Sequence, residues 1–474
     1  MANLRSSELS TIKYRMIHVV IFSSLAILLV SSADVGFVAI IAKFLWFLAL
    51  VVICMQDIGA GFGMYIVSVA IYNAYHVLGA TSLLDRLDNF GLIILIIFAV
   101  FRAKLRTANK TSLLSFLILI FVFSALIQAR AGNYLEWYSL AQFLRMFGLP
   151  LACFVVLSLS SPSLREIRSY FVIMMILGGY MAVISIFEKL NLYSVIVPHW
   201  IGDPSINAAI GSGRSGGAIL QPEFNGFALG LISCIILGEI YFRKSRIPTI
   251  KYSILLLCIL GIYFTFTRAA WLAILVASFY FLFLSASANI NKQFRFLACL
   301  AFAIILFIIL FVFPSQLAKE RASDTGTIDY RFNLWAAGLK MASHKPLLGY
   351  GISQFQVGAP DYQTSLGLVP EVFIPKTGTG AHNVFINILV EQGIFGLIIY
   401  LLIIRQVFLQ SKSSSDRLFL GSGASWINAF TLVYFMNAQF VNIHEPTTNL
   451  IYFGTMGLIA GLRRGKSKQS KGLR

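Results

Sequence analysis

Fourteen apolar stretches run through the chain, and several are about 17 to 20 residues long and almost free of charge. A helix of that length crosses the roughly 30 Å hydrocarbon core of a bilayer. Helices are the expected spanning elements, because backbone groups in lipid must bond within their own segment. The alternation typical of a membrane β-barrel is missing from runs such as Phe296 to Phe313. The sequence therefore predicts an all-α polytopic membrane protein.

The charge of the chain supports this interpretation through its distribution. Only 12% of the residues are charged, and the net charge is +18. That charge would suggest a nucleic-acid partner in a soluble protein, but here the basic residues gather in alternate short loops and in the tail Arg463 to Arg474. This is the positive-inside pattern, so we expect both termini in the cytoplasm and no nucleic-acid partner. Charges such as Lys43 and Asp85 interrupt the first four stretches, which leaves a range of about 12 to 14 spans.

The predicted spans alternate with two long outward segments. The spans are 17–33, 35–54, 61–79, 88–101, 112–128, 144–160, 169–187, 223–241, 250–267, 269–287, 296–313, 384–407, 419–440 and 447–462. The corresponding parts are N-terminal helices (1–187), a first outward loop (188–222), central helices (223–313), a large outward loop (314–382), C-terminal helices (383–462) and a basic tail (463–474).

The large outward loop contains the signal of an amphipathic helix. Apolar residues recur at three- and four-residue steps from Tyr330 to Met341, a spacing that places them on one helix face. Such a helix would lie along the membrane surface or cap a cavity. The stretch Pro346-Leu-Leu-Gly-Tyr-Gly351 then ends it with a turn. The loop is therefore predicted to form a small extramembrane subdomain.

Four polar residues on the outward side form the candidate site. Arg214 lies in a glycine-rich loop, Arg268 between two predicted spans, Arg331 on the amphipathic helix and His382 at the start of the next span. Arginines recognise phosphate oxygens through planar, bidentate hydrogen bonds, so several around one cavity would suit a pyrophosphate. Histidine is the usual general base near neutral pH.

Each candidate also has an ordinary interpretation. Arg268 would serve as a snorkelling residue or as a cation at a helix C-terminus. Arg214 would be a solvated loop residue, Arg331 a solvated or lipid-phosphate-binding side chain, and His382 an interfacial histidine. Glu223 is either a charge favoured by the helix dipole or an alternative base.

Several functional classes lack their signals. There is no Walker A sequence, which leaves ATP-driven transport unsupported, and no outward Asp-x-Asp pair, which argues against the divalent-metal mode of nucleotide-sugar transferases. Acidic residues within the spans are scarce, unlike in ion-coupled transporters. The five cysteines lie in or beside apolar runs without paired spacing, so neither a disulfide framework nor a metal cluster is expected.

The order of the outward motifs resembles the O-antigen ligase and polysaccharide polymerase superfamily of bacterial inner membranes over about residues 200 to 400. The motifs that carry the resemblance are Gly213-Arg-Ser-Gly-Gly217, Pro222-Glu-Phe-Asn-Gly226, Thr267-Arg-Ala-Ala-Trp-Leu272, Tyr330-Arg-Phe-Asn-Leu-Trp335, Pro346-Leu-Leu-Gly-Tyr-Gly351, Ala381-His-Asn383 and Glu391-Gln-Gly-Ile-Phe-Gly396.

The resemblance implies a fold, a reaction and partners. The fold is a helical bundle with a large periplasmic loop over a cavity open to the lipids. A glycan carried on undecaprenyl pyrophosphate is transferred whole at the periplasmic face, without metal or cofactor and with inversion at the anomeric carbon. The acceptor is lipid A core in a ligase and another lipid-linked repeat unit in a polymerase. We favour the polymerase, with the ligase and a flippase of lipid-linked sugars as alternatives; the sugar, the linkage and the oligomeric state stay open.

The resemblance also assigns roles to residues. Arg214 and Arg268 resemble the arginines that contact the pyrophosphate, and His382 the histidine that assists the acceptor. These three are the expected catalytic residues, with Arg331, Glu223 and Asn383 expected to bind substrate. Many ligases carry asparagine where Glu223 stands, so Glu223 remains a second candidate base.

Overall fold

The computed structural model describes most of the helical part of the chain. The described residues are 46, 48–77, 97, 112–131, 140, 143–197, 199–202, 213–241, 248–280, 326–368, 380–418, 423–440 and 446–462. The predicted spans 17–33 and 296–313, nearly all of 88–101, part of 35–54 and the basic tail 463–474 lie outside the described residues.

Every regular element in these ranges is helical, which confirms the all-α prediction. The helices that match predicted spans are α3 (Ile58–Val77), α5 (Ser112–Ala131), α7 (Leu149–Leu159), α8 (Leu164–Lys189), α10 (Pro222–Tyr241), α11 (Pro248–Phe264), α12 (Arg268–Phe279), α17 (Val384–Leu418), α18 (Gly423–Phe440) and α19 (Pro446–Ala460). A short π-helix, η2 (Leu144–Gly148), leads directly into α7. Three 3-10 turns, η3 (Tyr193–Val195), η4 (His199–Gly202) and η5 (Gly217–Ile219), follow α8.

The chain is an integral membrane protein. Within the described ranges, three helical segments are long and apolar enough to cross a bilayer by themselves: Leu164–Lys189, Pro222–Ile240 and Val384–Ser414. Five shorter apolar helices accompany them. The full count of spans and the division into six parts stay predictions.

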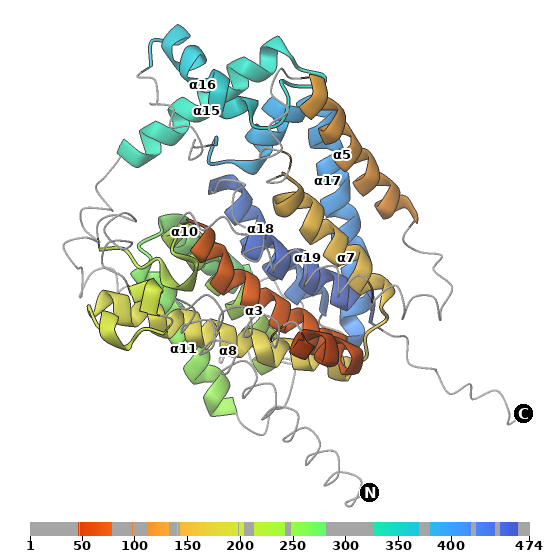
Figure 1. Ribbon diagram of the computed structural model, residues 1–474, viewed down its shortest axis with the longest axis vertical. Coiled ribbons are helices and arrows are strands. Elements are labelled where there is room, and N and C mark those ends of the chain that lie inside the picture. Colours follow the sequence, from red (N-terminus) through yellow and green to blue (C-terminus); the bar gives the residue numbers. More distant parts are fainter. Residues whose placement is uncertain are drawn as a thin grey trace, which may run out of the picture.

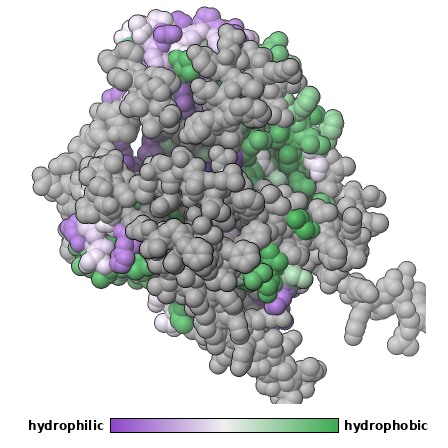
Figure 2. Space-filling view, viewed as in Figure 1, coloured by the Kyte–Doolittle hydropathy of each residue, from purple (hydrophilic) through white to green (hydrophobic). Residues whose placement is uncertain are grey.

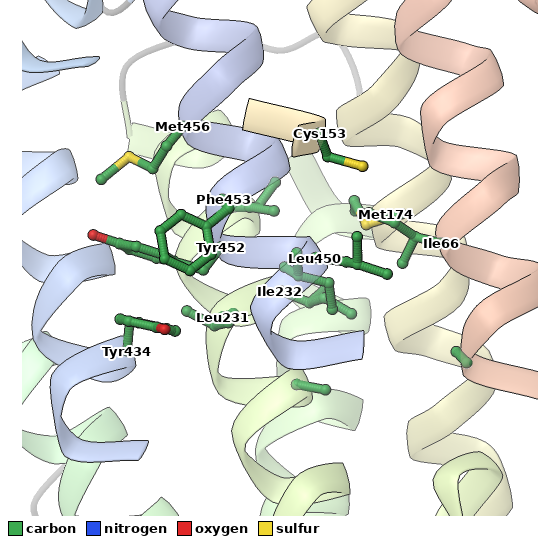
Figure 3. Close-up of a cluster of buried hydrophobic side chains, with 14 of the residues drawn as sticks. Ile66, Cys153, Met174, Leu231, Ile232, Tyr434, Leu450, Tyr452, Phe453 and Met456 are labelled. Carbon is green, nitrogen blue, oxygen red and sulfur yellow. The ribbon is translucent and has the colours of Figure 1, made fainter. Parts of the chain in front are cut away.

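Helix α19 lies in the middle of the bundle. Figure 3 shows buried side chains of α3, α7, α8, α10 and α18 around it, among them Ile66, Cys153 and Met174. The rings of Tyr434 and Tyr452 stack with centroids 3.8 Å apart. Because lipid is as apolar as a protein core, such helices associate mainly through close packing and small residues. Gly457 of α19, and Gly461 directly after the helix, provide that close approach to α7.

Gly457 and Gly461 lie closest to backbone atoms of the α7 segment. A Cβ added at Gly457 would lie 2.8 Å from the carbonyl oxygen of Phe154, and one at Gly461 would lie 2.7 Å from that of Leu157. A helix backbone cannot give way locally, so a methyl group would force α7 and α19 apart.

A cap of two helices covers one end of the bundle, at the top of Figure 1. Helix α15 (Gly326–His344) confirms the predicted amphipathic helix, since Leu334 and Met341 are fully buried. Helix α16 (Gln354–Ser365) was not predicted from the sequence. Together with the first half of α17, the two helices enclose a small core of their own, in which Phe355 is fully buried.

The cap is joined to the bundle at a break in α17. Gly393 has φ 67° and ψ −171°, which interrupts the helix. The backbone N–H groups of Tyr350 and Gly351 donate to the carbonyls of Val390 (2.8 Å) and Glu391 (2.9 Å). These bonds replace the helical partners that the break removes. In return, the N–H of Ile394 donates to the carbonyl of Pro346 at 2.8 Å. Two motifs about 40 residues apart in the sequence therefore form one structural unit.

We expect Gly457→Ala to destabilise the bundle by about 1 to 3 kcal/mol, because its methyl group would overlap the α7 backbone. Gly179→Ala on α8 is the matched control, since its Cβ would meet only Ile254 at 3.8 Å. Thermal unfolding of the purified protein in detergent measures both. Equal melting temperatures for the two variants would contradict close α7–α19 contact.

We expect Gly349→Ala to detach the cap from the α17 break. Gly349 has φ +73°, and an added Cβ would lie 2.5 Å from the backbone of Glu391. Hydrogen exchange should rise at Tyr350, Gly351 and Ile394. Gly367→Ala controls for backbone strain alone, because Gly367 has φ +70° with nothing within 4 Å of the added Cβ. If both variants exchange alike, crowding against α17 is not what fixes the cap.

Candidate active site

Arg214 is held against the connection between α11 and α12. Its Nε donates to the carbonyl of Thr265 at 3.1 Å, and its Nη2 donates to the hydroxyl of Thr267 at 2.9 Å. The next residue continues the contact, because the N–H of Ser215 donates to the carbonyl of Phe264 at 3.0 Å. The glycine-rich loop and the α11–α12 connection are thus one unit, although they lie about 50 residues apart in the sequence.

Arg268 is the first residue of α12, and Thr267 is the N-cap. This placement corrects the alternative in which Arg268 is a cation at a helix C-terminus, since α11 already ends at Phe264. The Thr267 side chain makes no capping bond to the α12 backbone, and the first turn of α12 holds no acidic residue. The N–H groups at a helix start favour a bound anion, and an arginine there adds donors for the same anion. The start of α12 therefore has donor groups suited to an anion.

The connection before α12 is also strained. Phe266 lies between the two threonines that bind Arg214 and has φ 47°, the left-handed region that residues other than glycine rarely adopt. Such conformations persist where surrounding contacts fix them, commonly at functional sites. The rings of Tyr263 and Trp271 pack against Phe266, with centroids 5.6 and 6.3 Å away.

Arg331 connects the cap to the bundle through an ion pair. Its Nη2 lies 3.1 Å from Oε1 of Glu223, with 17% of the Arg331 side chain and 26% of the Glu223 side chain exposed. Glu223 stands in the first turn of α10, where the helix dipole favours a negative charge. Both residues were predicted to bind substrate, with Glu223 also a second candidate base, and in the structure the two side chains pair with each other.

His382 lies just before α17 and is half-buried, with φ 47°. Its ring meets the ring of Tyr330 edge to face, with centroids 6.1 Å apart. Asn383 caps α17: its Oδ1 accepts from the N–H groups of Phe385 (3.0 Å) and Ile386 (3.1 Å). The amide of Asn383 donates to Gln439 on α18 at 2.9 Å. The Asn383 side chain thus fixes the start of α17, directly beside His382.

The first turn of α10 links the two halves of the site. At Gly226, one turn after Glu223, an added Cβ would lie 2.9 Å from the Cβ of Ala270 and 3.1 Å from Oγ1 of Thr265. The α11–α12 connection, which binds Arg214 and contains Arg268, thus packs against this turn on one side. On the other side Arg331 pairs with Glu223, and its neighbour Tyr330 contacts His382. Figure 2 shows hydrophilic residues inside a recess below the cap in this view.

One further charged group at the site was not predicted. Glu188, in the last turn of α8, is 5% exposed, and its Oε2 accepts from the Ser215 hydroxyl (2.5 Å) and from the N–H of Gly217 (2.9 Å). The only sequence signal was a carboxylate at the border between an apolar span and the outward loop.

No three His, Cys, Asp or Glu side chains gather as potential metal ligands among the described residues. Four of the five cysteines fall in the described ranges, where they are buried thiols that form no disulfide. The expectation of a reaction without metal stays a prediction.

Comparisons with known proteins show a family match and a relative. Residues 253–401 match the family described as O-Antigen ligase. The matched range holds Arg268, Arg331 and His382. The chain is also 25% identical over 218 residues to a ComP-specific O-oligosaccharyltransferase of Acinetobacter baylyi (strain ATCC 33305 / BD413 / ADP1). That alignment covers 43% of this chain and 38% of the relative, so the chain spans well under two thirds of the relative's length.

Proposed function

We propose that the chain is a member of the O-antigen ligase superfamily that transfers a preassembled glycan from undecaprenyl pyrophosphate to an acceptor sugar hydroxyl. The family match over residues 253–401 and the name of the relative support a membrane-bound, ligase-type glycan transferase. The donor, the direction of transfer and the location belong to the proposal. We place the site at the periplasmic face of a bacterial inner membrane, with both termini in the cytoplasm.

The observation that carries the proposal is the cationic start of α12. Arg268 stands at the positive end of the helix, and the hydroxyl that would normally cap the helix binds Arg214 instead. Backbone N–H groups at a helix start and a guanidinium group both bind anions, so together they favour a bound anion here. A diphosphate supplies several oxygens for the guanidinium groups and for the helix N-terminus, which a neutral sugar does not. Neither arginine needs a metal ion for this role.

The reaction that we propose is a single displacement. The acceptor oxygen attacks the anomeric carbon, the bond from that carbon to the diphosphate oxygen breaks, and its electron pair leaves with the diphosphate. Arg214 and Arg268 stabilise the charge that develops on the departing diphosphate, an effect often worth several kcal/mol. The neutral imidazole of His382 takes the acceptor proton, which typically contributes about 10² to 10⁴ in rate. Attack from the face opposite the diphosphate inverts the anomeric carbon.

We assign the base to His382 rather than Glu223. The Glu223 carboxylate already neutralises Arg331 at 3.1 Å, and removing a proton from the acceptor would weaken that pair. His382 stands at a helix start that Asn383 fixes, against an aromatic ring of the cap. Arg331 and Glu223 are then proposed to align the cap over the bound substrates, with Asn383 holding His382 in place.

For the acceptor we retain the polymerase, which extends another lipid-linked repeat unit. The relative's name favours a second candidate, because an O-oligosaccharyltransferase specific for ComP transfers to a dedicated acceptor. The corresponding reaction here is the ligase reaction on lipid A core. In a deletion strain, single repeat units on lipid A core would indicate a polymerase, whereas full-length chains left on undecaprenyl carrier would indicate a ligase. Unchanged glycans in both fractions would contradict either reaction.

We expect Arg214→Ala, Arg268→Ala and His382→Ala each to lower glycan transfer by about 10² or more in detergent, where no compartments exist and a flippase would show no product. Matched controls are Arg405→Ala, an exposed arginine of α17, and His344→Ala, an exposed histidine of the cap. Both controls should keep the wild-type rate. Wild-type transfer by all three site variants would defeat the assignment.

A further inference from the structure

The last turn of α8 contacts both segments that meet at Arg214. Glu188 accepts hydrogen bonds from Ser215 and Gly217, which follow Arg214 directly. The next residue, Lys189, places its Nζ 4.9 Å from the centre of the Phe266 ring. Phe266 lies between the two threonines that accept from the Arg214 guanidinium. One helix turn thus touches the segment that carries the arginine and the segment that receives it.

The hydrogen bonds of Glu188 hold the loop after Arg214 against the end of α8. A buried carboxylate makes charge-assisted hydrogen bonds, which are roughly twice as strong as neutral ones. Both bonds converge on the single oxygen Oε2, so Ser215 and Gly217 are held around one point. Gly217 has φ +57°, and an added Cβ would lie within 2.5 Å of the Asn225 side-chain atoms. The loop therefore has little freedom to move away from Glu188.

A carboxylate at the buried end of α8 would cost free energy without benefit if its role were only to fill space. Ionisable groups at the end of an apolar span cost free energy to bury and are typically functional. The nearby Asn225 makes a neutral contact instead, donating to the Ser185 hydroxyl at 2.8 Å. Glu188 differs from Asn225 in that one of its oxygens accepts from both Ser215 and Gly217, which ties the arginine loop to α8 at two points.

We propose that Glu188 is the positioning residue for Arg214: it fixes residues 215–217 so that the guanidinium stays at the start of α12. The inference rests on the proposed function, in which Arg214 contacts the diphosphate. Glu188 itself touches no substrate. Its loss should therefore act only through Arg214 and should affect the donor rather than the acceptor.

The test is a double-mutant cycle measured as glycan transfer in detergent. Glu188→Ala should lower transfer by about 10-fold or more and raise the KM of the donor, with the KM of the acceptor unchanged. In the Arg214→Ala background, Glu188→Ala should have no further effect. Glu188→Gln keeps an acceptor oxygen for both bonds and should restore much of the rate. Ser215→Ala removes one bond and should give a smaller loss of the same kind.

A matched control separates positioning from general damage. Glu239 is also buried on an apolar helix, where it pairs with Lys251 at 2.9 Å near the end of α10 remote from Glu223. Glu239→Ala should leave donor and acceptor KM unchanged. If Glu188→Ala does not accumulate as folded protein, the cycle is run with Ser215→Ala.

The outcomes separate the inference from the function on which it rests. Losses that multiply in the double variant, or a raised acceptor KM, overturn the positioning role. Full activity of Glu188→Ala while Arg214→Ala is inactive overturns it as well and leaves the proposed function standing. Wild-type activity of Arg214→Ala overturns the proposed role of Arg214 and the inference with it.

Discussion

The cap stays on the bundle because backbone groups released at Gly393 must find partners. In a bilayer protein an unpaired carbonyl has no water to bond with, so a helix break is tolerated only where other backbone replaces the lost bonds. The turn from Pro346 to Gly351 does so for α17. This pairing fixes the end of α15, because the helix ends at His344, two residues before the turn. Near the start of α15, Tyr330 and Arg331 contact His382 and Glu223.

The electrostatics of the site come from helix starts as much as from side chains. Glu223 lies in the first turn of α10, where a negative charge is at home, and it compensates Arg331. Arg268 begins α12 and adds an arginine to the N–H groups of that helix start. The two helix starts thus differ: the first turn of α10 contains Glu223, whereas the first turn of α12 contains no acidic residue. This difference favours a diphosphate beside α12 rather than beside α10.

Much of the fold was predictable because hydropathy alone marks helices in a membrane protein. The stretches 223–241 and 250–267 correspond closely to α10 and α11. Helix α16 was missed because its sequence contains Pro360 inside the helix and lacks a strong apolar face. Its stability comes from contacts with α15 and α17, which sequence periodicity does not reveal.

The site was predictable in its residue types and less so in its partnerships. Arginine and histidine near the outer ends of spans are unusual enough to be noticed one by one. That Arg331 pairs with Glu223 depends on a contact between residues 108 apart. That Glu188 binds Ser215 depends on how the loop folds back on α8. Asn383 was expected to bind substrate, but a helix cap at that position looks the same in sequence.

Close-packed glycines leave α19 almost no room to shift. With backbone in contact, α7 and α19 form a stiff frame. In the proposed function, a bulky lipid-borne donor has to reach and leave a site beneath the cap. Any widening must then fall on contacts made by side chains, which can part and re-form without breaking backbone pairing. The Arg331–Glu223 pair is such a contact. The rate of turnover would then depend on how fast the cap separates from the bundle at this ion pair.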